Sequence, residues 1–347
     1  MRAINRRRTP SDSTSIPLGS AYVLFLAAAS GAAAAGTLAV THVAGYRHVV
    51  GAVARFDGVW LPVCLAAQVV AYFGYVLAVR AVARVDGGPR LSFALTTRTV
   101  VAGFGVYAAT HSSGGFTVDY WALRRSGLAR REAMARVLGL GALEYAVLAP
   151  AALVSALVLL FSGGDGHVQE AMTLPWLLVV PGFLAAAWLT SPSRADRLRN
   201  PERNGRGREA VAHLVAGAAT LRAMATKPLE YRAGLAGVAL YWLGDIACLW
   251  AALQLFSAHV AVPALIVAYA TGYVITRRSL PLGGAGLVEV LMTFALVWVG
   301  VPIAPAALGV IVYRVFNFWL PILPALAVLP TVKELRREFA EAERAAD

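Results

Sequence analysis

The chain has 347 residues, of which 59% are hydrophobic and only 14% are charged, and its mean hydropathy is +0.64. Because about a quarter of the residues of a soluble domain are charged, this composition excludes an ordinary soluble protein and indicates a polytopic membrane protein. The net charge of +12 does not indicate a nucleic-acid partner, since the cations lie in short loops between apolar stretches, as the positive-inside rule expects.

Apolar stretches recur along the chain and predict an all-α protein of about eight transmembrane helices with both termini in the cytoplasm. The first stretch, Leu18–Val43, follows three arginines and is too long for the apolar core of a signal peptide. The predicted spans are 18–44, 59–83, 137–162, 173–191, 233–257, 262–276, 286–301 and 304–330.

This topology places 28 of the 31 Lys and Arg residues on the cytoplasmic side, which supports the orientation. The cytoplasmic linker contains a helical pattern of apolar residues from Ala210 to Met224 and predicts an amphipathic helix at the inner surface. The expected divisions are a basic tail 1–17, an N-terminal membrane half 18–191, a linker 192–232, a C-terminal membrane half 233–330 and a cytoplasmic tail 331–347.

Residues 93–115, between the second and third spans, form an apolar stretch that contains Arg98 and the polar run His111-Ser112-Ser113. Both flanks are basic, so a complete crossing would break the charge pattern. We therefore expect a re-entrant segment that enters and leaves on the cytoplasmic side. His111 is interpreted as a hydrogen-bonding residue of a polar loop rather than as a catalytic base.

Residues 277–289 separate two apolar stretches, 262–276 and 286–301, that contain only 15 and 16 residues. At 1.5 Å per residue each covers roughly 22 to 24 Å of a hydrocarbon core about 30 Å thick, so the connecting loop is expected to sink into the membrane. Irregular backbone at that depth is tolerated only where it is buried in protein or lines a polar cavity. Two interrupted segments, one in each half, predict a central binding site.

The Gly-rich loop 283–286 ends where a helix begins, so its free backbone N–H groups would suit an anion such as a lipid phosphate. The alternative is that its glycines only permit close helix packing. No Lys-Ser or Lys-Thr pair follows the glycines, so the loop is not a P-loop. The residues assigned to this headgroup site are Arg277, Arg278, Pro281, Gly283, Gly284 and Gly286.

Ionisable residues inside predicted spans need a partner or a polar path, since each costs roughly 2.5 to 3.5 kcal/mol at the bilayer centre. Asp245 and Arg314 lie at matching depths, which predicts a buried pair, with a lipid phosphate as the alternative partner of Arg314. Glu289 lies in the first turn of its helix, where it either caps that helix or serves the site. Glu144 has no helix end nearby and is expected to face Arg98, a hydroxyl or a wet cavity.

The C-terminal third contains four motifs in order: Tyr241-Trp242-Leu243-Gly244-Asp245, Leu280 to Glu289, Gly300-Val301-Pro302 and Tyr313-Arg314. Their order and spacing resemble the flippase-like transmembrane region of lysylphosphatidylglycerol synthases and their stand-alone relatives. Two departures stand out: the second proline of the family's Pro-Gly-Gly motif is missing, and the acid that usually follows Glu144 is absent. No aminoacyl-transferring domain is recognised, so this chain is not expected to make lysyl-lipid by itself.

The resemblance implies a multi-pass protein of the bacterial cytoplasmic membrane that binds an anionic phospholipid or lipid-linked headgroup and moves it between leaflets. A transporter is favoured over an enzyme because no catalytic motif is found, and no cofactor or metal is expected. The alternative is a membrane-embedded enzyme or accessory subunit that acts in lipid-linked glycan or phospholipid modification. A separate synthase partner and a homo-oligomer are both left open.

Overall fold

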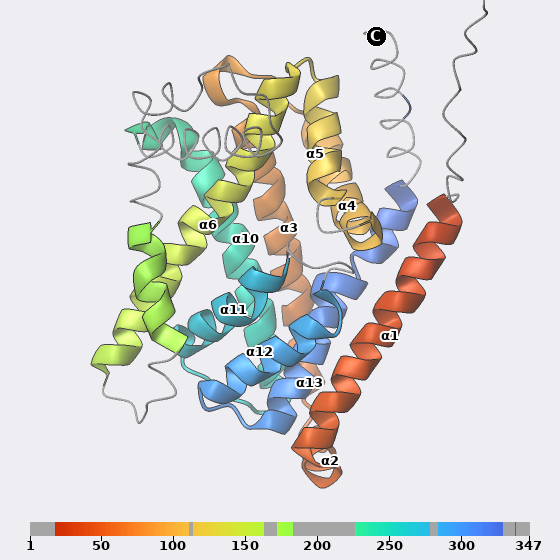
Figure 1. The fold of residues 1–347 in the computed structure, drawn as a ribbon, viewed down its shortest axis with the longest axis vertical. Coiled ribbons are helices and arrows are strands. Elements are labelled where there is room, and N and C mark those ends of the chain that lie inside the picture. The colour runs from red at the N-terminus through yellow and green to blue at the C-terminus, as the bar shows by residue number, and fades with distance from the viewer. Residues whose placement is uncertain are drawn as a thin grey trace, which may run out of the picture.

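The computed structural model describes residues 18–110, 114–162, 172–182, 226–277, 284–328 and 337, and every regular element among them is a helix (Figure 1). This confirms the all-α class. The predicted amphipathic helix of the linker lies outside the described residues. The helices are α1 Leu18–Ala44, α2 Tyr46–Val53, α3 Leu61–Ala83, α4 Phe93–Thr110, α5 Gly114–Arg125, α6 Arg130–Phe161, the short helix Met172–Gly182, α10 Pro228–Gln254, α11 Val262–Arg277, α12 Leu287–Trp298 and α13 Ile303–Arg314.

Five helices of the described chain are long and apolar enough to cross a bilayer, which confirms a multi-pass membrane protein. The last of them continues through a π-helical turn, η4 (Val315–Trp319), and each of the five coincides with a predicted span. They are Val23–Ala44, Gly58–Ala83, Arg130–Phe161, Leu229–Gln254 and Ile303–Val328.

Helices α1, α6 and α10 begin and α3 ends at one end of the molecule, so α6 and α10 run in the same direction (Figure 1). The chain also reaches this end after α13. The described part of the chain therefore begins and ends on the same side, and that this side faces the cytoplasm stays a prediction.

Two helical hairpins enter from opposite ends (Figure 1). The α4–α5 hairpin starts at the end where α3 finishes, and its helices pack on each other, as expected for a re-entrant segment at 93–115. The α11–α12 hairpin starts at the opposite end, and both of its helices are shorter than a complete span. We expected two separate crossings here, whereas α11 ends and α12 begins at mid-height.

Glycines bring α3 and α10 into direct backbone contact at the centre of the molecule. A Cβ atom at Gly237 of α10 would lie 2.6 Å from the backbone nitrogen of Ala78 and 2.7 Å from the backbone oxygen of Gly74, both in α3. Close approach through small residues is a main source of helix association in membranes, where lipid removes the hydrophobic driving force. This close contact fixes the position of α3 relative to α10, and with it the polar side chains that both helices carry.

Gly237→Ala is expected to lower the free energy of unfolding by about 1 to 3 kcal/mol, because the new methyl group pushes two backbones apart. Gly31→Ala in α1 is the matched control, since nothing lies within 4 Å of its Cβ position. That control should be neutral or slightly stabilising, as alanine is the better helix former. Thermal unfolding in detergent measures both variants, and equal melting temperatures would contradict the close α3–α10 contact.

Candidate functional site

Asp245 of α10 is completely buried at the point where four helical segments meet. Its Oδ1 atom accepts hydrogen bonds from the Gln68 side-chain amide in α3 (2.7 Å) and from the Asn317 side-chain amide in η4 (2.5 Å). Its Oδ2 atom accepts from the Tyr313 hydroxyl in α13 at 2.8 Å and from the Tyr269 hydroxyl in α11. All four partners of this Asp245 cluster are neutral.

The two oxygens of Asp245 therefore have different surroundings. The Gln68 and Asn317 amides contact Oδ1 through N–H groups, which only donate. The two tyrosine hydroxyls that contact Oδ2 can either donate or accept. A proton on Oδ2 would require one tyrosine hydroxyl to turn from donor to acceptor, and both bonds to Oδ1 would persist. The cluster thus accommodates Asp245 with or without a proton.

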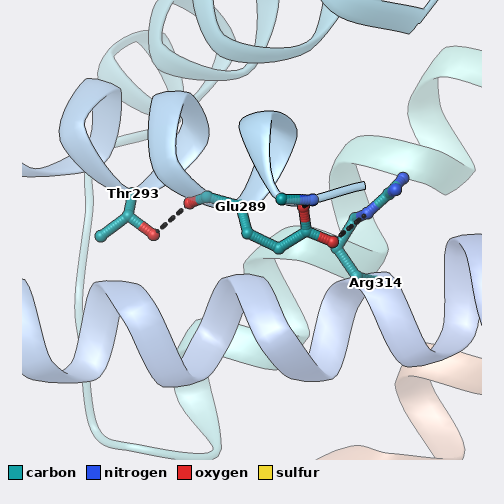
Figure 2. A network of polar contacts seen from close by, with 4 residues as sticks. Glu289, Thr293 and Arg314 are labelled. Carbon is teal, nitrogen blue, oxygen red and sulfur yellow. Dashed lines mark hydrogen bonds and ion pairs between the residues drawn. The ribbon is translucent and has the colours of Figure 1, made fainter. Parts of the chain in front are cut away.

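The expected pair of Asp245 and Arg314 is not formed, because Arg314 of α13 pairs with Glu289 of α12 instead (Figure 2). The Arg314 Nε atom donates to Glu289 Oε1 at 3.0 Å, and both side chains are buried. Successive residues of a helix point about 100° apart. Tyr313 consequently faces Asp245, while Arg314 faces the start of α12.

Glu289 also caps its own helix, as one of the two sequence interpretations expected. Its Oε2 atom accepts a 2.7 Å hydrogen bond from the backbone N–H of Gly286, and its backbone oxygen accepts from the Thr293 hydroxyl at 2.6 Å (Figure 2). The guanidinium of Arg314 stacks over the Phe318 ring at 4.3 Å from its centroid. One carboxylate thus connects the start of α12 to α13.

The glycines before α12 serve helix packing as well as turn geometry. Gly284 and Gly286 have positive φ angles of 71° and 86°, which residues with a Cβ atom rarely adopt. A Cβ atom at Gly286 would lie 2.6 Å from the backbone oxygen of Ala32 in α1. The Gly286 N–H is already bonded to Glu289, so at this position the packing alternative is favoured over an anion-binding N–H.

The other predicted site residues differ in their placement. Glu144 of α6 is buried, and its backbone oxygen accepts from the Trp242 indole at 2.9 Å. Arg98 of α4 is exposed, so its side chain and the buried Glu144 occupy different environments. Arg277 is the last residue of α11. The predicted residues that lie outside the described part of the chain are His111, Arg278, Pro281 and Gly283.

Our sequence interpretation missed the side chains that hold Asp245. Gln68 and Asn317 each carry an amide inside an apolar span, and such groups need a polar partner in a membrane. That rule would have selected both residues. Tyr269 gives no comparable signal, because tyrosines recur in the apolar stretches of this chain.

Comparison with known families extends the resemblance beyond the C-terminal third. A family model described as the lysylphosphatidylglycerol synthase TM region matches residues 21–325. The matched region includes the Asp245 cluster, the pair of Glu289 and Arg314, and both helical hairpins. No curated protein matches the chain.

Proposed function

The chain belongs to the family of the lysylphosphatidylglycerol synthase transmembrane region, and we propose that it binds an anionic phospholipid or lipid-linked headgroup and moves it between leaflets. The observation that carries the proposal is the completely buried Asp245, held by side chains from α3, α11, α13 and η4. Ionisable groups inside a membrane are costly and mark ion pathways, proton relays and substrate sites. Asp245 is the proposed coupling residue.

The α11–α12 hairpin supports a substrate site near the membrane centre. Broken helices whose ends lie at mid-depth form the binding sites of many transporters. Here the start of α12 carries Glu289, which is bound to Arg314. A lipid phosphate is the proposed competitor for Arg314, because guanidinium groups bind carboxylate and phosphate in similar geometry. Headgroup binding would free Glu289 and loosen the start of α12.

Energy for transport is proposed to come from a proton gradient. Asp245 can accept a proton on Oδ2 when Tyr269 or Tyr313 reverses its hydrogen bond, as its surroundings allow. The two tyrosines belong to α11 and α13, so this exchange changes how the hairpin is held against the last span. Protonation and hairpin position are thereby linked.

Asp245→Asn tests the proposal, because it removes the charge and the titratable group while it keeps the size of the side chain and one oxygen that can accept from Gln68 and Asn317. In vesicles that contain the purified protein, transfer of a fluorescent phosphatidylglycerol between leaflets should fall by about tenfold or more, because the amide cannot take up and release the coupling proton; a tenfold fall raises the barrier by about 1.4 kcal/mol. Thermal stability should change little. Asp57→Asn makes the same chemical change at an exposed position before α3 and should leave transfer unaltered.

Two results would contradict the proposal. One is wild-type protein that transfers no anionic lipid, and the other is Asp245→Asn protein that transfers it at the wild-type rate. An absence of transfer together with a stoichiometric protein partner on purification would favour the accessory-subunit alternative.

A further inference from the structure

A groove of about 610 Å³ runs along the side of the molecule between α3, α4 and the segment 316–324. None of its 15 lining residues is charged, so the groove suits an apolar group. The groove is open along one side, where Val69, Phe73 and Leu323 expose 61%, 46% and 62% of their surface. Both α3 and the helical region 303–328 are candidate spans, so the open side faces hydrocarbon.

The last span is interrupted where it forms the groove wall. In η4 the Leu320 N–H bonds to the Val315 oxygen, one residue further back than in an α-helix. Pro321 and Pro324 follow and lack the N–H groups that would continue the helix. π-Helical turns occur frequently at functional sites. The interruption places Phe316, Leu320 and both prolines along the groove.

Three lining side chains carry a polar group, Gln68, Tyr72 and Thr97, and two of them, Gln68 and Thr97, donate hydrogen bonds within the protein. The Gln68 amide donates to Asp245, and the Thr97 hydroxyl donates to the backbone oxygen of Phe93 at 2.9 Å. A membrane helix about 10 Å across would fill 610 Å³ within about five residues of its length, so the groove is too small for a packed span. Its volume lies within the range of small-ligand sites, roughly 300 to 1,000 Å³.

We propose that this groove binds one acyl chain of a membrane phospholipid. The inference deepens the proposed function and rests on it for the identity of the lipid: the tail lies in the groove while the headgroup is transferred. Two elements join the groove to Asp245. Gln68 lines the groove and bonds to Asp245, and η4 contributes Phe316 to the groove wall and Asn317 to the carboxylate.

Photolabelling in vesicles tests the site with phosphatidylglycerol that carries a diazirine in one acyl chain. Peptide mass spectrometry should find more label per exposed area at Phe73, Val101 and Leu320 than at the exposed residues Val23 and Leu24 of α1. Labelling of the groove should saturate as the lipid fraction rises, whereas labelling of α1 should rise in proportion. Proportional labelling at both places would mean that the groove meets only bulk lipid, and the proposal would be overturned.

Val101→Phe should reduce groove labelling by about fivefold or more, since the larger side chain occupies part of the groove. Thr97 lies one helical turn before Val101 on the same face of α4 and also lines the groove. Thr97→Phe is therefore a second blocking variant if Val101→Phe does not fold. Leu38→Phe enlarges another exposed apolar side chain of α1 and should change the labelling neither of the groove nor of Val23 and Leu24. Unchanged groove labelling in both folded α4 variants would overturn the proposal.

Measuring lipid transfer in the same vesicles separates the two proposals. Saturable groove labelling without any transfer would refute the proposed transport and leave the acyl-chain site standing. Transfer at the wild-type rate by a blocked variant that has lost groove labelling would refute the role of the groove in transport. Loss of both labelling and transfer in Val101→Phe, with a melting temperature near that of wild type, is the expected result.

Discussion

Replacing Arg314 with alanine should lower the free energy of unfolding by about 3 to 5 kcal/mol, because the change leaves the buried charge of Glu289 without its partner. The Glu289 carboxylate would then keep its hydrogen bond from the Gly286 N–H but lose its cationic partner. The cation over the Phe318 ring is lost as well. Unfolding in mixed detergent micelles, followed by tryptophan fluorescence, measures the loss.

A double-mutant cycle separates the ion pair from general damage. Glu289→Gln keeps an acceptor for the Gly286 N–H, so combining it with Arg314→Met removes both charges and should recover much of the stability lost in Arg314→Met alone. Arg55→Ala, at an exposed arginine between α2 and α3, is the control and should cost less than about 0.5 kcal/mol. Purely additive effects of the two substitutions would show that the pair contributes no coupling energy.

Gly286→Ala should be nearly as damaging, because two separate costs act at this residue. Its φ angle of 86° lies in the left-handed region, where a Cβ atom costs about 1 to 2 kcal/mol. The same atom would also lie 2.6 Å from the Ala32 backbone oxygen and force α1 away from α12. This overpacking should lower the free energy of unfolding by about 1 to 3 kcal/mol more. Thermal melting and proteolysis of α1 measure the combined effect.

Two other glycines isolate these costs. Gly300 has a φ angle of 96° with nothing within 4 Å of its Cβ position, so Gly300→Ala measures the backbone cost alone. Gly36 lies in the regular helix α1, and its Cβ atom would be 2.6 Å from the Gly286 oxygen, so Gly36→Ala measures the packing cost alone. If Gly286→Ala costs no more than Gly300→Ala, α1 does not pack closely on this turn.

The pattern of apolar stretches was sufficient to predict the five long spans, but not the helices α2 and α5 or the π-helical turn η4 in the last span. Hydrocarbon requires each spanning segment to satisfy its own backbone hydrogen bonds, so length and apolarity alone identify spans such as 59–83 and 137–162. The same rule identified 262–276 and 286–301 as unusually short. It did not reveal that α11 and α12 form one hairpin that returns to its own side, because hairpin packing depends on contacts between helices.

Among the candidate site residues, the sequence determined depth and the tertiary structure decided partners. A rise of 1.5 Å per residue is common to all helices, so Asp245 and Arg314 could be assigned to similar depths by counting. The direction in which each side chain points depends on how its helix is rotated and on which helix lies beside it. Tyr313 therefore reaches Asp245, and the adjacent Arg314 reaches Glu289.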